Sequence, residues 1–295
     1  MDRMIKGITE RSRIRITLVD VTMTAKALEA RHLSGPVAGA VLAESLAAVA
    51  LLASDAGHEE EAWMVRMNTS GPIGGVLVEA TGAGRLRGFT NRKTLDHLDG
   101  MLPVKTSDAL GDSGSVQVVS TLPGRIVSQA VLNVNPPQIR YVLGRYYNHS
   151  MQVPTGCNIW VVADDGGLHS ARALLVQRME DSDQDAFIAL LDGLDKGCLD
   201  ACMHERVWPQ DIMTSLQDIW DCDAIVVREQ KPLCFGCRCN KEKVLGVLVS
   251  LSKDELEAMI RAGESQDVTC HMCGHSYVAN PDDLRTVLKR MPQGK

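Results

Sequence analysis

Two hydrophobic patterns stand side by side near the start of the chain. Apolar and polar side chains alternate over residues 13–21, which predicts a strand with one solvent-facing side. Residues 24–32 predict a short helix, and residues 37–53 are almost continuously apolar after Pro36, a residue favoured in the first turn of a helix. The apolar run contains Glu44 and is shorter than the roughly 20 residues that cross a membrane, so it predicts a buried core helix.

Short apolar runs separated by turn residues follow the long helix. They predict five strands, at residues 63–67, 76–80, 86–90, 116–120 and 126–132. The glycines of Gly82-x-Gly84-x-x-x-Gly88 come directly after one of these strands. Because a strand follows them, and not a helix, the pattern indicates a hairpin turn in place of a dinucleotide-binding loop.

The strand pattern continues to residue 179 with one further helix. That helix follows Pro136-Pro137, and two strands are predicted after it, at 157–163 and 170–179. Strands grouped in runs, without regular alternation with helices, favour an α+β fold over a doubly wound one. We therefore predict a first domain over residues 1–179, with a mixed sheet and packed helices.

Residues 180–230 have a different composition. Seven acidic residues surround apolar ones at 180–200, which predicts an acidic amphipathic helix interrupted by Gly193 and Gly197. Pro209 predicts the start of a second short helix, and residues 222–230 form an acidic connector with one short strand. Isolated helices of this length are marginal in water, so we predict a metastable helical linker that folds only where it packs on another part of the chain.

Residues 231–295 form the last predicted domain. A helical pattern at 244–251 is followed by a capping box, Ser252 to Glu255, that starts a second helix ending at Gly263. A final helix starts at Asn280-Pro281 and reaches about residue 289. So small a unit seldom folds without a metal or a disulfide.

Close pairs of cysteines in this domain indicate a zinc site. They are Cys234-x-x-Cys237, Cys237-x-Cys239 and Cys270-x-x-Cys273, and either of the first two can complete a tetrathiolate site with the third. Four sulfur ligands leave no open position for substrate or water, which argues against a hydrolytic zinc enzyme. A disulfide between Cys237 and Cys239 would close a strained ring that is easily reduced.

The composition limits the partners and the compartment. The 31 basic and 37 acidic residues give a net charge of −6, and 4% of residues are aromatic, so no nucleic acid is expected as a partner. The first residues show no apolar signal segment, and no membrane partner is expected. We expect a cytoplasmic protein, where cysteines stay reduced and can bind metal. A nucleotide-binding Walker motif is absent from the sequence.

The thiol domain, together with much of the rest of the chain, resembles a known family. Residues 237–242, residues 268–273 and Tyr277 are similar to the C-terminal zinc domain of the 33 kDa heat-shock family of redox-regulated holdase chaperones. Five parts of the first domain resemble that family too: Arg31-His32 with the alanine-rich helix after Pro36, and residues 70–75, 85–88, 150–155 and 174–179. Cys234 is not part of the family's motif.

The resemblance implies a function that is not enzymatic and has no catalytic residues. Reduced Cys237, Cys239, Cys270 and Cys273 would hold one zinc ion, and oxidation would form Cys237–Cys239 and Cys270–Cys273 disulfides and release it. The linker would then lose order and expose apolar surface. A homodimer of the oxidised protein would bind unfolding client proteins through its first domain and prevent their aggregation without ATP.

Two other functions fit the residues alone. One is a constitutive protein-interaction adaptor with a purely structural zinc site. The other is a thiol oxidoreductase that uses Cys234-x-x-Cys237.

Overall fold

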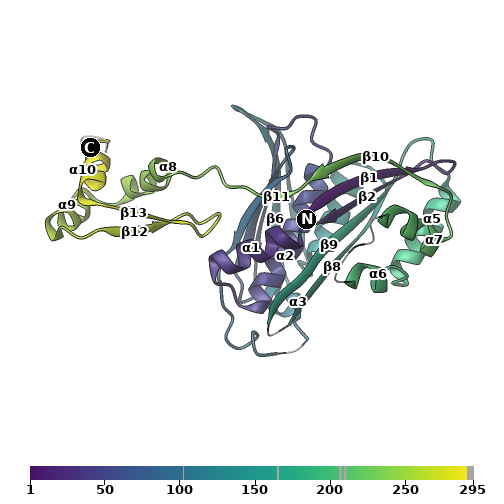
Figure 1. The fold of residues 1–295 in the computed structure, drawn as a ribbon, viewed down its shortest axis with the longest axis horizontal. Coiled ribbons are helices and arrows are strands. Elements are labelled where there is room, and N and C mark those ends of the chain that lie inside the picture. Colours follow the sequence, from purple (N-terminus) through teal and green to yellow (C-terminus); the bar gives the residue numbers. More distant parts are fainter. Residues whose placement is uncertain (102, 165, 206–207, 209–210, 291–295) are drawn as a thin grey trace. The chain divides into compact units, whose positions relative to one another are not determined.

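The computed structural model describes residues 1–101, 103–164, 166–205, 208 and 211–290. The chain divides into two compact units, Met1–Gly236 and Cys237–Lys295. The α+β class predicted from the sequence is confirmed (Figure 1). The predicted linker, residues 180–230, lies within the first unit. The predicted division into 1–179, 180–230 and 231–295 depends on how stable each part is by itself, and it stays a prediction.

The first sheet contains five strands in the order β10-β1-β2-β9-β8, and all neighbours run antiparallel. Its strands are β1 (Arg3–Thr9), β2 (Ile14–Asp20), β8 (Thr155–Asp164), β9 (Gly167–Arg178) and β10 (Ile225–Pro232). The sequence predicted β2, β8 and β9. It missed β1, because Lys6 and Gly7 interrupt the apolar pattern. It also underestimated β10, which pairs with β1 along its whole length.

The second sheet contains six strands in the order β11-β5-β4-β3-β6-β7. They are β3 (Ala62–Thr69), β4 (Gly75–Thr81), β5 (Arg85–Thr90), β6 (Gly114–Leu122), β7 (Arg125–Val134) and β11 (Cys234–Phe235). Only β11 runs parallel to its neighbour, which makes the sheet mixed. The five predicted strands are confirmed. The predicted hairpin turn joins β4 to β5, with Gly84 at φ +79°, a conformation that favours glycine.

One helix, α2 (Pro36–Ala53), forms the centre of the first unit. It contacts strands of both sheets, and 16 of its 18 residues are buried. Its many alanines allow strands to approach closely. It is long and apolar enough to cross a membrane, but it is the buried core helix that the sequence predicts. Shorter helices lie around it: α1 (Thr22–His32), α3 (Thr106–Leu110) and α4 (Ile139–Arg145), which continues as a π-helical turn, Tyr146–Ser150.

The linker region covers the face of the first sheet opposite α2. Its helices are α5 (Gln184–Asp195), α6 (Asp200–His204) and α7 (Ile212–Trp220), and Figure 1 shows them on one side of the sheet with α1 and α2 on the other. The predicted start of a helix at Pro209 lies outside the described residues. The predicted helix over 180–200 is shorter, because the Asp183 side chain caps α5 and the helix ends at Asp195.

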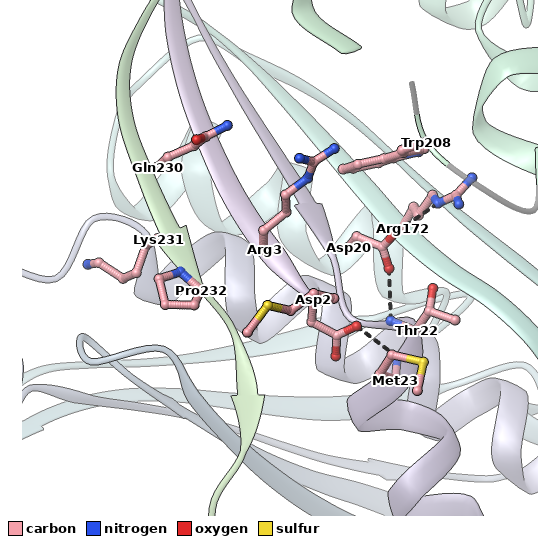
Figure 2. Close-up of a pocket in the computed structure, with 11 residues that line it drawn as sticks. Asp2, Arg3, Asp20, Thr22, Met23, Arg172, Trp208, Gln230, Lys231 and Pro232 are labelled. Atoms are coloured by element: carbon pink, nitrogen blue, oxygen red, sulfur yellow. Dashed lines mark hydrogen bonds and ion pairs between the residues drawn. The ribbon is translucent and has the colours of Figure 1, made fainter. Parts of the chain in front are cut away.

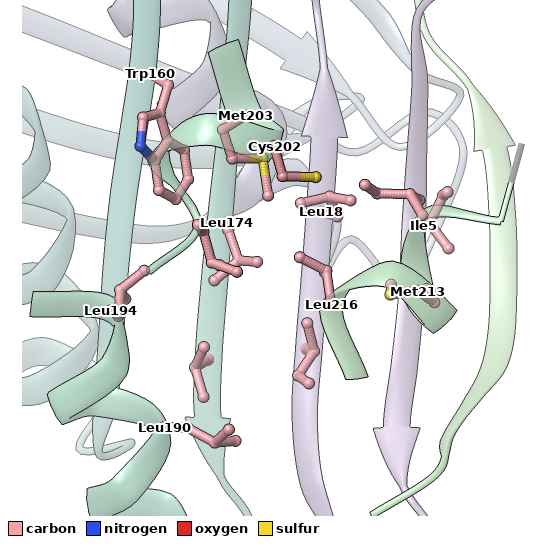
Figure 3. Packing of buried hydrophobic residues seen from close by; sticks show 14 of the residues in the cluster. Ile5, Leu18, Trp160, Leu174, Leu190, Leu194, Cys202, Met203, Met213 and Leu216 are labelled. Carbon is pink, nitrogen blue, oxygen red and sulfur yellow. The ribbon is translucent and has the colours of Figure 1, made fainter. Parts of the chain in front are cut away.

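The linker helices and the sheet form one apolar cluster (Figure 3). Alternate residues of β2 contribute to it, and so do residues of α5, α6 and α7 that include Leu190, Met203 and Leu216. Leu190 and Leu194 of α5 are buried as expected, but Ile188 is 52% exposed. The linker is therefore folded against the sheet with part of its apolar side chains still in water.

The second unit is small. It contains α8 (Lys241–Leu245), a 3-10 helix (Gly246–Ser250), α9 (Lys253–Ala262), β12 (Gln266–Thr269), β13 (Ser276–Ala279) and α10 (Pro281–Arg290). The predicted capping box is confirmed, and Gly263 ends α9 at φ +69°. Among its described residues, seven partly buried apolar side chains pack against a cluster of five buried ones, Leu245, Leu256, Ala279, Leu284 and Val287. A core of this size is too small to stabilise a fold by itself.

Candidate metal centre

Two segments of the second unit position four cysteine side chains. Cys237 and Cys239 lie just before α8, where the Asn240 side chain accepts a hydrogen bond from the backbone N–H of Lys243 and starts the helix. Cys270 and Cys273 lie in the turn between β12 and β13. The four sulfur atoms all lie within 4.8 Å of one another. Among the described residues, no other group of three or more metal-binding side chains is so arranged.

The turn between β12 and β13 has the geometry that brings Cys270 and Cys273 together. The backbone N–H groups of Cys273 and Gly274 donate to the carbonyl oxygen of Cys270, at 3.3 and 2.8 Å, and the N–H of Cys270 donates to His275. Gly274 has φ +68°, which lets the chain reverse within four residues. The pairing of β12 with β13 then holds both ends of the turn.

The sulfur positions fit a tetrahedral ion. The Sγ atoms of Cys237 and Cys270 are 3.9 Å apart, and those of Cys239 and Cys273 are 3.5 Å apart. A tetrahedral zinc with Zn–S bonds of about 2.3 Å requires sulfur separations of about 3.8 Å. Four thiolates favour zinc over harder cations such as Mg²⁺ or Ca²⁺. The cluster is therefore consistent with a zinc site.

The sequence left open which pair of cysteines completes the site with Cys270-x-x-Cys273, and the structure brings one of the two pairs together with it. The cluster contains Cys237-x-Cys239 with Cys270-x-x-Cys273. Cys234 lies in β11 of the first unit, where it pairs with Arg85 of β5 and is exposed.

Burial makes the thiols of Cys270 and Cys273 hard to ionise unless a cation is bound. Burial raises the pKa of Cys270, and it raises the pKa of Cys273 well above its usual range. The backbone N–H groups of Met272 and His275 oppose this, because they hydrogen-bond the two sulfurs and favour the thiolates. A bound divalent cation reverses the balance by favouring deprotonated ligands.

A tyrosine also contacts the cluster. The Oη atom of Tyr277 lies 3.3 Å from the Sγ of Cys239, and this hydrogen bond raises the pKa of Tyr277 to about 12. The His275 ring meets the Tyr277 ring edge to face, with centroids 4.7 Å apart. Sequence reasoning noted Tyr277 as part of the family motif, but nothing in the spacing indicated its contact with sulfur.

A second polar site lies in the first unit, where the linker meets the sheet (Figure 2). Arg172 of β9 is 2% exposed, and its Nε donates to the carboxylate of Asp20 at 3.1 Å. Its Nη1 donates to the carbonyl oxygens of Met203 and Glu205, at 2.8 and 2.6 Å, at the end of α6. A buried guanidinium must be satisfied in this way, so Arg172 ties the linker backbone to the sheet.

Trp208 lies beside this buried arginine, and we call Arg172, Asp20 and Trp208 the linker anchor. The Arg172 guanidinium lies 5.0 Å from the centre of the Trp208 ring, and that of Arg3 lies 5.7 Å from it. Figure 2 shows these side chains beside an open cavity of about 820 Å³ that Asp2 and Lys231 also line. Sequence reasoning missed the anchor. Arg172 lies in a predicted strand, and no local pattern shows which linker carbonyls it will reach.

Comparisons with known proteins agree over nearly the whole chain. Residues 2–280 match the family model described as Hsp33 protein. The chain is 27% identical to a 33 kDa chaperonin of Lactiplantibacillus plantarum, with 98% of each chain covered. It is 28% identical to a 33 kDa chaperonin of Trichodesmium erythraeum, with 99% of this chain and 94% of the relative covered.

A solved structure shares the fold. The crystal structure of a 33 kDa chaperonin from Thermotoga maritima superposes with a TM-score of 0.82, at 24% identity, and covers 98% of both chains. The family match spans both units and includes all four clustered cysteines. The chain belongs to the Hsp33 family of redox-regulated chaperones.

Proposed function

We propose that this protein is a holdase that oxidation of Cys237, Cys239, Cys270 and Cys273 switches on. The observation that carries the proposal is the gathering of these four sulfurs within 4.8 Å in a unit with a five-residue core. Such a unit depends on its metal ligands for folding, so a chemical change at sulfur becomes a change in fold.

In the reduced protein the four cysteines would act as thiolate ligands of one zinc ion. Zinc binding to small units of this kind contributes about 10–16 kcal/mol of apparent folding free energy. Residues of three segments would thereby be held together: the chain before α8, the turn after β12, and the helices packed on them. The resting protein keeps the second unit folded.

Oxidation would convert the ligands into two disulfides. We propose the pairs Cys237–Cys239 and Cys270–Cys273, as the family resemblance implies. A disulfide sulfur is a poor zinc ligand, so bond formation would remove the ligands, and the second unit would lose most of its stability.

The client surface in this proposal is the face of the first sheet that the linker covers. Ile14, Ile16 and Leu18 of β2 and Leu174 and Val176 of β9 are fully buried beneath α5, α6 and α7. Release of the linker would expose this apolar face together with the apolar side of the linker helices. Contiguous apolar surface of this kind binds unfolded chains, and it also supports the proposed homodimer of the oxidised protein.

The remaining proposals concern the setting. The oxidised protein would act in the cytoplasm, on unfolding proteins, without nucleic acid or membrane as a partner. The excess of acidic residues supports the absence of a nucleic-acid partner.

The decisive experiment follows zinc release, thiol loss and client protection together. The reduced protein is titrated with hypochlorous acid, and light scattering of a heat-unfolded client is measured at each point. We expect protection to rise as zinc leaves and four thiols are lost. Cys157→Ser serves as a matched control, because Cys157 lies outside the cluster. If the oxidised, zinc-free protein protects no better than the reduced protein, the switch is wrong.

The same experiment tests the other functions. A constitutive adaptor with a structural zinc would lose partner binding on oxidation and would gain no protection. A thiol oxidoreductase would reduce insulin catalytically with a thiol donor. We expect no turnover, because the sulfur of Cys237 belongs to the four-sulfur cluster, which does not include Cys234.

A further inference from the structure

The sulfurs of the cluster receive hydrogen bonds from different kinds of donor. Cys270 is bonded by the backbone N–H of Met272, and Cys273 by the backbone N–H of His275. Cys239 is bonded by a side chain, the hydroxyl of Tyr277, at 3.3 Å. The backbone donors are fixed by the conformation of the turn, and a side-chain substitution does not remove them. The donor to Cys239 is a side chain, so one substitution removes it.

The Tyr277 hydroxyl is held in place by the fold. Tyr277 lies on β13, where it pairs with Val268 of β12. The His275 ring packs edge to face against its ring, at 81°. A phenol with a usual pKa of about 10 carries its proton at neutral pH, so the hydroxyl is the donor and the sulfur is the acceptor.

A hydrogen bond to a thiolate weakens its reactivity. The bond stabilises the negative charge of the sulfur, because charge-assisted hydrogen bonds are stronger than neutral ones. The transition state for attack on an oxidant carries less charge on sulfur, so it gains less from the donor. We propose that Tyr277 is a positioning residue that holds Cys239 in its ligand form and thereby sets how readily the cluster is oxidised. The inference rests on the proposed ligand set and redox function.

The step that Tyr277 restrains is the oxidation of thiolate by a hydroperoxide. A thiolate attacks one oxygen of hydrogen peroxide, the O–O bond breaks, and a sulfenic acid and hydroxide form. A second thiolate then displaces hydroxide from that sulfur and forms the S–S bond. In total, two thiolates, one peroxide and two protons give one disulfide and two water molecules.

The test compares Tyr277→Phe with the wild type in the full-length, reduced, zinc-loaded protein. Phenylalanine keeps the ring and its contact with His275 but removes the donor. We expect thiol loss and zinc release under hydrogen peroxide to be about tenfold faster, a change of about 1.4 kcal/mol in a barrier, as for the loss of a hydrogen bond to a charged acceptor. Tyr141→Phe is the matched control, because Tyr141 is 45% exposed on α4 in the other unit.

A second measurement separates this role from a structural one. Both proteins are loaded with Co²⁺, and the sulfur-to-cobalt charge-transfer band is recorded. Removal of a donor from sulfur should move the band of Tyr277→Phe to lower energy at unchanged cobalt stoichiometry. Equal oxidation rates with an unmoved band would overturn the inference, and so would loss of the four-sulfur spectrum, which would make Tyr277 a folding residue.

The outcome is independent of client protection. Thiol and zinc kinetics need no client, so a protein that oxidises as expected but fails to protect clients would refute the proposed function alone. A variant that oxidises at the wild-type rate would refute only the role of Tyr277.

Discussion

The two faces of the first sheet are buried equally well by very different covers. Ile16 and Leu18 of β2 face the linker, Val19 faces α2, and all three are 0% exposed. One cover is a single apolar helix of 18 residues, α2. The other consists of three short helices of 12, 5 and 9 residues that carry acidic side chains. The burial of the sheet residues in the folded state therefore does not show how easily the helices that cover them can detach.

The two covers differ in how much helical structure they would keep, and how much apolar surface they would expose, after detaching from the sheet. Short helices are marginal in water, and Gly193 inside α5 weakens that helix further by about 1 kcal/mol relative to alanine. Part of the linker is already suited to solvent, with Ile188 and the acidic residues exposed. By contrast, α2 would expose an almost wholly apolar surface. We therefore expect α2 to act as a permanent cover of the first sheet and the linker helices to act as a removable cover.

The largest expected effect comes from breaking the metal cluster. Cys273→Ser should abolish zinc binding and unfold the second unit, because about 10–16 kcal/mol of folding free energy depends on the metal. Zinc content by mass spectrometry and amide hydrogen exchange measure the outcome. If the linker depends on the second unit, exchange should accelerate in α5, α6 and α7 and stay slow in α2. Equal acceleration in α2 would contradict the distinction between the covers.

Removing the linker anchor should release the removable cover alone. Arg172→Met leaves the Asp20 carboxylate unpaired and the carbonyls of Met203 and Glu205 without their donor. Breaking a buried pair costs about 3–5 kcal/mol. We expect faster proteolysis of the linker and client binding in the reduced protein.

Arg15→Met is the control for that experiment, because Arg15 lies on the opposite face of the sheet and pairs with Asp55 at 3.4 Å. Its side chain is 29% exposed, so its loss should cost at most about 1 kcal/mol. An anchor with no special role would make the two variants behave alike.

Two matched leucines compare the covers directly. Leu46 in α2 and Leu216 in α7 are both 0% exposed, and truncation of either to alanine removes about 2–5 kcal/mol of local packing. Leu46→Ala should lower the main urea transition of the first unit. Leu216→Ala should leave that transition in place and loosen the linker only, as measured by limited proteolysis. A common shift in both variants would show that the covers unfold as one.

The smallest effect concerns a weak point in the permanent cover. Burial in α2 raises the pKa of Glu44 from 4.5 to about 7, although Thr106 donates a hydrogen bond to it. The folded state binds the proton more tightly than the unfolded state. The contribution of this group to the free energy of unfolding is therefore fully present below pH 4.5 and is lost as the pH rises through about 7.

Glu44→Gln should remove that fall. Its advantage over the wild type should grow between pH 4.5 and 7 and reach up to about 3 kcal/mol, as measured by urea unfolding at several pH values. The exposed Glu59→Gln serves as the control and should show no such trend. A flat difference across this range would mean that Glu44 is ionised in the fold.

Features that local chemistry determines were predictable from the sequence. The core helix, the strands β3 to β7 and the capping box at Ser252 were predicted because periodicity and cap residues lie within a few positions of each other. The cysteine spacing indicated a four-sulfur site but left two registers open. What escaped prediction depends on distant partners: β1 needs β2 and β10 on its two sides, Arg172 needs linker carbonyls, and Tyr277 needs a sulfur 38 positions away.

The short connection after β10 has an entropic consequence. Strand β10 ends at Pro232, and only the two-residue strand β11, with Phe235 stacked 4.7 Å from the Arg31 guanidinium, precedes Cys237. While the second unit is folded, β11 is followed by a compact body. Once that unit unfolds, β11 carries a long fluctuating tail, and the conformational freedom of the chain increases with every residue that leaves β5. Unfolding of the second unit would therefore favour release of β11 from β5, and then fraying of the edge strand β10.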